Sequence, residues 1–365
     1  MLGKPGIIPA DAPLLLLILL LLALPVPPCE AFMARSLAGL SRFASQVLQR
    51  SSHFLHSRTR TVMSARDPRQ DGMRGSLFQY APQLQAFESG PGDAEKKLIM
   101  IGGLSDGLLP CWYVPSLGQA ASEEGWSMVQ PILRSSYNMW GFGSLERDVE
   151  DLSALLDFLA REREGKKFAI CGPPTGCQTA CHYMRSRENL PQHNISHIIL
   201  QAGVSDRELE DADALAKQQE NLQAARQLAR QSGGGDEFLP RSACWAPVTA
   251  QRFLDLNDVG GKDDYFSSDL SEDELARRFG GFYSTTDVMI AYSSKDEYVP
   301  STVNKQELVE RIARAMRGEG GKARVVPLVV PNANHALSPL PEDPESASAE
   351  KFFVAQVREF LRDSK

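Results

Sequence analysis

The chain has 365 residues, of which 42% are hydrophobic and 23% charged, a globular composition that excludes a disordered, collagen-like or disulfide-scaffold protein. Its formal net charge is −7, but residues 1–66 contain seven basic and two acidic side chains, whereas residues 67–365 contain 32 basic and 44 acidic ones. An acidic body excludes nucleic acid as the expected main partner, because binding to phosphates requires a basic surface.

The N-terminal region predicts a signal peptide. Residues 14–24 read LLLLILLLLAL, and Pro25, Pro27 and Pro28 follow. Eleven apolar residues are too few to span a bilayer, which needs about 20, but they match the core of a signal peptide. We therefore expect a cleaved signal peptide over residues 1–31 and no stable membrane span in the mature chain. A buried or anchoring helix is the disfavoured alternative, since the prolines end any helix there.

The next segment, residues 32–66, has the composition of a transit peptide. Residues 33–66 contain six arginines and seven serines, and no acidic side chain. A signal peptide followed by such a segment resembles the bipartite plastid presequence of algae with complex plastids. We expect delivery to the plastid through the endoplasmic reticulum, with secretion or the endomembrane lumen as the alternative.

Residues 67–365 alternate short apolar runs with segments of helical periodicity. The runs predict strands at Lys97–Ile101, Ser127–Leu133, Lys167–Cys171, Ile195–Gln201, Asp287–Ser293 and Ala323–Val330. Helices are predicted at Gly143–Arg163, Thr175–Arg187, Gln306–Arg317 and Ser348–Arg362. Pro131 lacks a backbone donor and favours a sheet edge for the second strand. The alternation predicts an α/β fold with a mostly parallel sheet covered by helices on both faces.

Residues 206–285 break this alternation. They begin with Asp206–Ser232, a long segment rich in Ala, Gln, Glu and Leu that stops at three consecutive glycines. We expect a helix there and interpret the whole region as a small helical cap inserted into the α/β domain of residues 67–365.

Three loops that follow strands carry the residues of a catalytic triad. The outer glycines of Gly172-Pro173-Pro174-Thr175-Gly176 match G-x-S-x-G, which places the nucleophile at position 174. The loop after residue 293 offers Asp296 as the orienting acid, with Glu297 as a neighbouring candidate, and the loop after residue 330 offers His335. The order nucleophile, acid, histidine is that of α/β-hydrolases.

Longer motifs support the same interpretation. They are Gly102–Gly107 (GGLSDG), Trp126–Tyr137, Gly143–Asp148 (GSLERD), Ile199–Glu208, Asp263–Leu270 (DDYFSSDL) and Asp296–Pro300. Together they resemble the fusarinine C esterase-like family, a group of α/β-hydrolases of fungi, plants and algae. The likeness covers roughly residues 75–362 and implies an α/β-hydrolase fold and a serine esterase ancestry.

The chain departs from this family at the nucleophile. The family pattern resembles G-H-S-T-G-C-Q, whereas this chain has Pro173-Pro174 in place of His-Ser. Pro174 has no nucleophilic atom, and its φ is restricted to about −65°, so we expect a locally relaxed loop in which Pro174 opens the following helix. The sequence thus predicts a non-catalytic protein with a binding or scaffold role. The alternative is an active ester hydrolase with a substitute nucleophile or a water activated by His335.

The resemblance also implies an oxyanion hole formed by the amide of Thr175 and by the loop of Gly103 and Leu104, although that loop also reads as a plain tight turn. Thr175, Cys171 and Cys177 are disfavoured as substitute nucleophiles, because the Thr175 side chain should point elsewhere and the cysteines should be buried.

Cys177, Cys181 and His182 share a helix face, but their spacing fits core packing better than zinc. We therefore expect no metal and no cofactor, and a small ester-like molecule as the ligand. The aromatic residues Trp112, Tyr137 and Trp140 either line its pocket or belong to the core.

Overall fold

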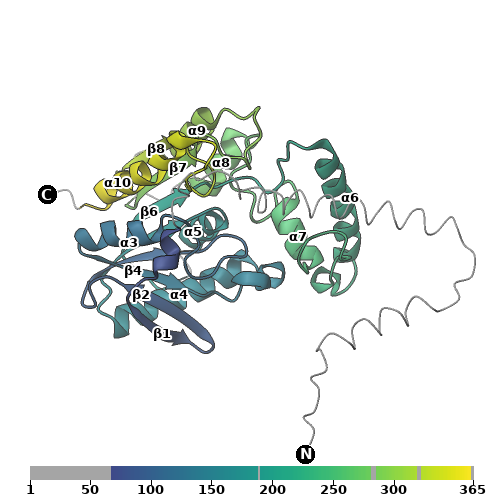
Figure 1. The fold of residues 1–365 in the computed structure, drawn as a ribbon. Coiled ribbons are helices and arrows are strands. Elements are labelled where there is room, and N and C mark those ends of the chain that lie inside the picture. Colours follow the sequence, from purple (N-terminus) through teal and green to yellow (C-terminus); the bar gives the residue numbers. More distant parts are fainter. Residues whose placement is uncertain (1–66, 188–189, 281–284, 319–321, 363–365) are drawn as a thin grey trace, which may run out of the picture. The chain divides into compact units, whose positions relative to one another are not determined.

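The computed structural model describes residues 67–187, 190–280, 285–318 and 322–362, so the expected signal and transit segments lie outside the described residues. Eight strands form one sheet with the order β1-β2-β4-β3-β5-β6-β7-β8 (Figure 1). The strands are β1 (Ser76–Ala81), β2 (Leu84–Ser89), β3 (Lys96–Met100), β4 (Trp126–Pro131), β5 (Lys167–Gly172), β6 (Ile195–Gln201), β7 (Asp287–Ser293) and β8 (Val325–Val330). In this spatial order, every neighbouring pair from β4 through β3 to β8 is parallel, whereas the pairs β1–β2 and β2–β4 are antiparallel.

The prediction that Pro131 marks an edge strand is wrong. Strand β4 lies inside the sheet between β2 and β3. Pro131 is the last residue of β4, opposite Ala86 of β2. The amide of Ile132 donates to the carbonyl of Gln85 at 2.8 Å, so the ladder to β2 does not require a donor at Pro131. The β1–β2 hairpin, which the strand predictions missed, covers this side of the sheet.

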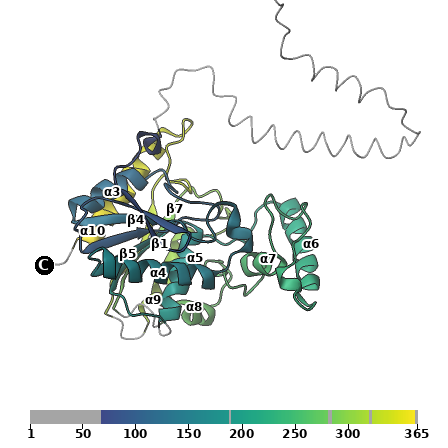
Figure 2. The same ribbon diagram turned by 90° about the horizontal axis from the view of Figure 1, so that it is seen from below.

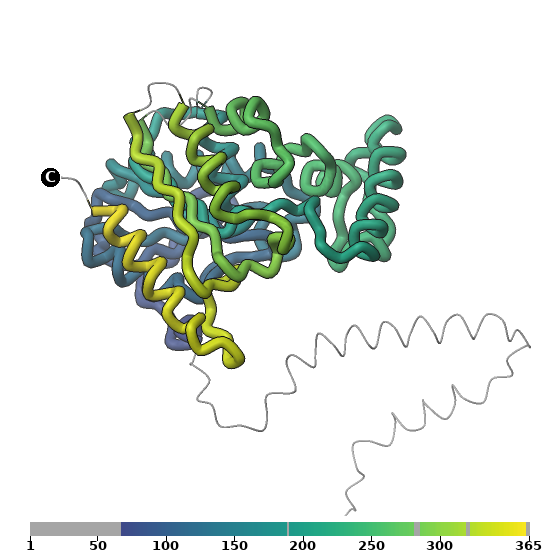
Figure 3. The backbone as a smooth tube through the Cα atoms, turned by 90° about the horizontal axis from the view of Figure 1, so that it is seen from above, coloured from purple at the N-terminus to yellow at the C-terminus, as the bar shows by residue number. Residues whose placement is uncertain are grey.

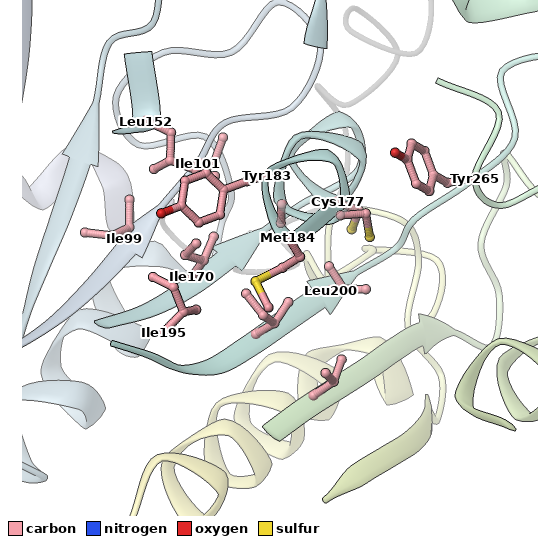
Figure 4. Packing of buried hydrophobic residues seen from close by; sticks show 14 of the residues in the cluster. Ile99, Ile101, Leu152, Ile170, Cys177, Tyr183, Met184, Ile195, Leu200 and Tyr265 are labelled. Carbon is pink, nitrogen blue, oxygen red and sulfur yellow. The ribbon is translucent and has the colours of Figure 1, made fainter. Parts of the chain in front are cut away.

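Helices cover both faces of the sheet, as predicted. They are α3 (Val114–Glu123), α4 (Leu145–Glu162), α5 (Thr175–Ser186), α6 (Ala212–Ala229), α7 (Ala250–Asn257), α8 (Glu272–Phe279), α9 (Lys305–Arg317) and α10 (Ala349–Leu361). Alternate residues of β3 face opposite ways: Leu98 packs in the cluster of α3 and α10, and Ile99 in that of α4, α5, α8 and α9. Figure 4 shows Cys177 and Met184 of α5 lying among strand residues such as Ile170.

The predicted elements outside the cap agree with the structure to within two residues at both ends. In the cap, α6 is shorter than the predicted 206–232. It begins after Asp211, whose carboxylate accepts a hydrogen bond from the amide of Ala214 at 2.7 Å. An N-cap of this kind satisfies an amide that has no partner within the helix.

Helices α6 and α7 lie beside the sheet (Figures 2 and 3) and have a small core of their own, which includes Leu222 and Phe253. They are held by a close backbone contact: Thr249 donates to the carbonyl of Gly141 at 3.0 Å, and a Cβ at Gly141 would lie only 2.0 Å from the carbonyl oxygen of Pro247. Helix α8 instead packs against α9 and α5. Within the described part of the chain, every helix is too short or too polar to cross a membrane.

Candidate functional site

The sheet register brings the predicted loops together. Neighbouring parallel strands end level with each other: Met100 of β3 pairs with Cys171 of β5, and Ser293 of β7 pairs with Val330 of β8. The loops after β3, β5, β7 and β8 therefore open at the same edge of the sheet, where ligands of α/β proteins bind.

The predicted acid and histidine are in contact. His335 Nδ1 lies 3.0 Å from Oδ1 and 2.9 Å from Oδ2 of Asp296. The Asp296 side chain is fully buried, and the amide of Tyr298 donates to its Oδ1 at 3.0 Å. The Glu297 carboxylate accepts a hydrogen bond from the backbone amide of His335 at 2.9 Å. The imidazole ring itself contacts Asp296 and not Glu297. The imidazole is therefore held through Nδ1, the arrangement that orients Nε2 in a hydrolase triad.

The elbow between β5 and α5 is tight. A Cβ at Gly172 would lie 2.3 Å from the carbonyl carbon of Gly176, and the amide of Gly176 donates to the carbonyl of Pro173 at 2.6 Å. Pro174 precedes the first residue of α5 with φ −1° and ψ −92°. This φ differs from the value near −65° that the proline ring favours, so the expected relaxed loop is not found, whereas the prediction that the helix begins after Pro174 is confirmed.

The two cysteines at the elbow are buried thiols. Cys171 and Cys177 are fully buried, and burial raises the pKa of both thiols, so neither forms a thiolate near neutral pH. The thiol of Cys177 donates to the carbonyl of Gly172 at 2.9 Å. Among the described residues, no hydroxyl or thiol forms a hydrogen bond with the imidazole of His335.

The predicted oxyanion-hole residues surround a cavity of about 20 Å³, large enough for one water molecule. Gly103, Leu104 and Thr175 all line it. The amide of Gly103 donates to Oδ2 of Asp106 at 2.9 Å, so this amide already has an anionic acceptor within the loop. Thr175, whose side chain was expected to point elsewhere, belongs to the cavity wall.

Buried charges, which the triad motifs did not reveal, lie next to this cavity. Arg252 of α7 donates from Nη1 to Oδ1 of Asp263 at 2.7 Å and from Nε to the carbonyl of Trp140 at 3.1 Å. Burial raises the pKa of Asp148 to about 6, and burial together with Asp263 raises that of Asp206 to about 7. The sequence could have indicated two of these buried charges, because Asp148 and Asp263 lie in the motifs GSLERD and DDYFSSDL that resemble the family.

The raised pKa of Asp148 predicts a pH-dependent stability. Its carboxyl prefers the protonated form in the folded chain, so the free energy of unfolding should fall as the pH rises from about 4 to about 6. We expect Asp148→Asn to lose about 3 kcal/mol of this pH dependence, measured by urea denaturation across the range. The exposed Asp213→Asn should keep the wild-type profile. Identical profiles for the wild type and Asp148→Asn would contradict the prediction.

A larger cavity of about 350 Å³ lies between the cap and the loop after β3. It shares Leu104 and Trp140 with the smaller cavity, so the two adjoin. Its wall combines apolar and polar side chains: Leu104, Trp140, Asp206, Leu209, Ala214, Lys217, Gln218, Asn221, Ala243, Cys244, Trp245, Phe253, Leu256 and Asn257. None of these cap residues was predicted as a site residue.

The aromatic and helix-face residues predicted from the sequence have different positions. Trp140 lines both cavities, Tyr137 is exposed, and Trp112 donates to Glu350 of α10 at 2.7 Å. His182 Nδ1 lies 3.2 Å from the hydroxyl of Tyr265. Among the described residues, no group of three or more His, Cys, Asp or Glu side chains is arranged to hold a metal ion.

Comparisons with known proteins agree with this architecture. A UPF0613 protein of Schizosaccharomyces pombe is 33% identical over 312 residues, covering 79% of this chain and 96% of its own length. Fusarinine C esterase sidJ of Aspergillus fumigatus is 30% identical and covers 80% and 96%, respectively. The solved structure of the siderophore hydrolase EstB from Aspergillus fumigatus matches with a TM-score of 0.67 at 29% identity over 80% of this chain and 97% of that chain.

An α/β-hydrolase-fold protein of unknown function, 21% identical with a TM-score of 0.54, matches 80% of this chain and 99% of its own and shows the same fold. The family model described as "Protein of unknown function (DUF1749)" matches residues 63–362. This chain therefore belongs to the DUF1749 family of α/β-hydrolase-fold proteins, close to the fusarinine C esterase and siderophore hydrolase of Aspergillus fumigatus.

Proposed function

We propose that this chain is a non-catalytic member of an esterase family, which binds a small molecule in the cavity beneath its cap. The observation that carries the proposal is Pro174 at the elbow. Acyl transfer by this fold needs a hydroxyl that the histidine can deprotonate, and proline supplies only carbon at that position.

The surroundings of the elbow support this proposal. Both neighbouring cysteines are buried thiols with raised pKa values. The cavity of about 350 Å³ falls within the usual range of small-molecule sites, and its lining is mostly apolar with a few polar groups. The names of two relatives indicate that they act on fusarinine C and on a siderophore. No cavity residue in this chain identifies such an ester, so we do not extend that substrate to this chain.

The proposal predicts that the purified chain neither reacts with a fluorophosphonate probe nor hydrolyses p-nitrophenyl acetate above the rate of buffer. Intact mass spectrometry detects a covalent adduct, and the release of nitrophenolate reports turnover. Labelling of any residue lining the two cavities, or turnover that is lost in His335→Ala, would contradict a non-catalytic role.

The intact contact between Asp296 and His335 favours a second candidate, hydrolysis by a water molecule that His335 activates. This reaction forms no acyl-enzyme. Turnover without a covalent adduct, abolished in His335→Ala, would distinguish it from both an inactive protein and a serine-type esterase.

For localisation, we propose the plastid route through the endoplasmic reticulum, on the strength of the leader composition at residues 14–66. A fluorescent protein fused after residue 66 should accumulate in plastids. Retention in the secretory pathway would favour the alternative of a secreted or lumenal protein.

A further inference from the structure

The polar groups of the larger cavity are mainly hydrogen-bond acceptors. The side-chain amides of three wall residues donate to protein acceptors: Gln218 to the carbonyl of Asp206 and to Oδ1 of Asn257, Asn221 to the carbonyl of Ala243, and Asn257 to the carbonyl of Phe253, all at 2.9 to 3.0 Å. Both N–H groups of Gln218 are thus used, and Asn221 and Asn257 each use one of theirs. The oxygens of Gln218 and Asn221 are left for a ligand that donates.

Gln218 supplies the sharpest indication of an absent donor. Its side chain is 7% exposed, and its Oε1 is buried without a hydrogen-bond partner among the described residues. A buried acceptor that lacks a donor costs about 1–3 kcal/mol. A ligand with several N–H donors in this cavity would remove that cost.

The carboxyl group of Asp206, at the same wall, lacks a direct cationic partner. In the part of the chain that the structure describes, no Lys, Arg or His forms an ion pair with Asp206, whose Oδ2 accepts only from the neutral amide of Gln178 at 3.2 Å. The guanidinium of the nearby Arg252 is already paired with Asp263 at 2.7 Å, and the ring of His335 contacts Asp296 at 2.9 Å. The cavity wall therefore presents a carboxyl group without a bound cation; burial raises its pKa to about 7, and a cation bound beside it would lower that pKa and favour the carboxylate.

Aromatic and aliphatic side chains form the rest of the wall. The rings of Trp140 and Trp245 lie 5.4 Å apart with an interplanar angle of 42°. Tryptophan faces attract organic cations through their quadrupole, and Leu209, Phe253 and Leu256 offer apolar contact to a hydrocarbon body. Lys217, the lining residue of opposite charge, is half-exposed and paired with Glu220 at 2.6 Å.

We propose that the cavity of the cap binds a small organic cation, an ammonium group on an apolar body, with Asp206 and Gln218 accepting from the ammonium and Trp140 and Trp245 packing against it. A carbonyl or hydroxyl of the ligand would accept from Nε1 of Trp140, a buried donor without an acceptor among the described residues. This inference rests on the proposed binding role and specifies its ligand class.

Isothermal titration of the purified full-length chain with hexylamine, 1-hexanol and hexanoate tests the charge preference with one apolar body. We expect hexylammonium to bind most tightly and hexanoate most weakly. Asp206→Asn should weaken hexylammonium binding about tenfold and change 1-hexanol binding little. Trp245→Ala should also weaken hexylammonium binding, because this exposed ring supplies cation–π contact.

The matched control is Asp213→Asn, which removes the same charge from an exposed position of α6 that does not line the cavity. It should bind hexylammonium like the wild type. Equal or tighter binding of 1-hexanol, or unchanged affinity in Asp206→Asn, would overturn the assignment of a cation site while leaving a non-catalytic binding role in place. Ester turnover by the wild type would contradict the proposed function and leave the charge preference to be judged by titration.

Discussion

Replacing Pro173 by His and Pro174 by Ser should raise the rate of p-nitrophenyl acetate hydrolysis about 1,000-fold or more above the wild type. Loss of a triad serine costs on the order of a million-fold in turnover, so its return to an intact site has a large effect. The imidazole of His335 is already held by Asp296 through Nδ1 at 2.9 Å, and the elbow glycines keep the tight turn on which a nucleophile projects.

The control is the same double variant with His335→Ala, which should lose the gained activity. A fluorophosphonate probe should label residue 174 in the double variant and not in the wild type. If the double variant folds, as judged by its thermal transition, and yet shows neither turnover nor labelling, then the surrounding cavity has also lost the geometry for acyl transfer.

Gly172→Ala should lower the free energy of unfolding by about 3 kcal/mol, at the upper end for a forced overlap in a packed site. The new Cβ would meet the backbone of Gly176 at 2.3 Å and of Cys177 at 2.7 Å, and backbone atoms cannot rotate away as a flexible side chain does. Urea denaturation measures the change.

Gly92→Ala is the matched control, since a Cβ there has open space around it. It should unfold at nearly the urea concentration of the wild type. If Gly172→Ala and Gly92→Ala unfold at the same urea concentration, the elbow accommodates a Cβ at residue 172 at little cost in stability, and the prediction is wrong.

The sequence predicted the central fold well because periodicity is local. Buried parallel strands such as Ile195–Gln201 are short apolar runs, and their prediction matches β6 residue for residue. The hairpin of β1 and β2 was missed, since its turn at Pro82 and Gln83 lacks the usual Asn-Gly signal. The edge position inferred from Pro131 failed because strand order depends on contacts distant in sequence.

The same division applies to the site. Asp296 and His335 were identified because each stands in a short motif after a strand, and the structure brings them together. The cap cavity was foreseen only at Trp140, which was expected to line a pocket or to belong to the core, because Trp140, Gln218 and Trp245 meet only when separate segments pack on one another. The spacing of residues along the sequence does not predict contacts of this kind.

The contact between Asp296 and His335 also bears on how the family evolves. Asp296 is buried at the end of β7, and loss of His335 would leave its carboxylate with only the amide of Tyr298 and the solvent-shielded interior, at a cost of about 1–3 kcal/mol. Selection for a stable fold alone is therefore enough to retain both residues over generations without any chemistry. We therefore expect the residue at the elbow to separate catalytic from non-catalytic homologues better than the pair of Asp296 and His335, which fold stability alone can preserve.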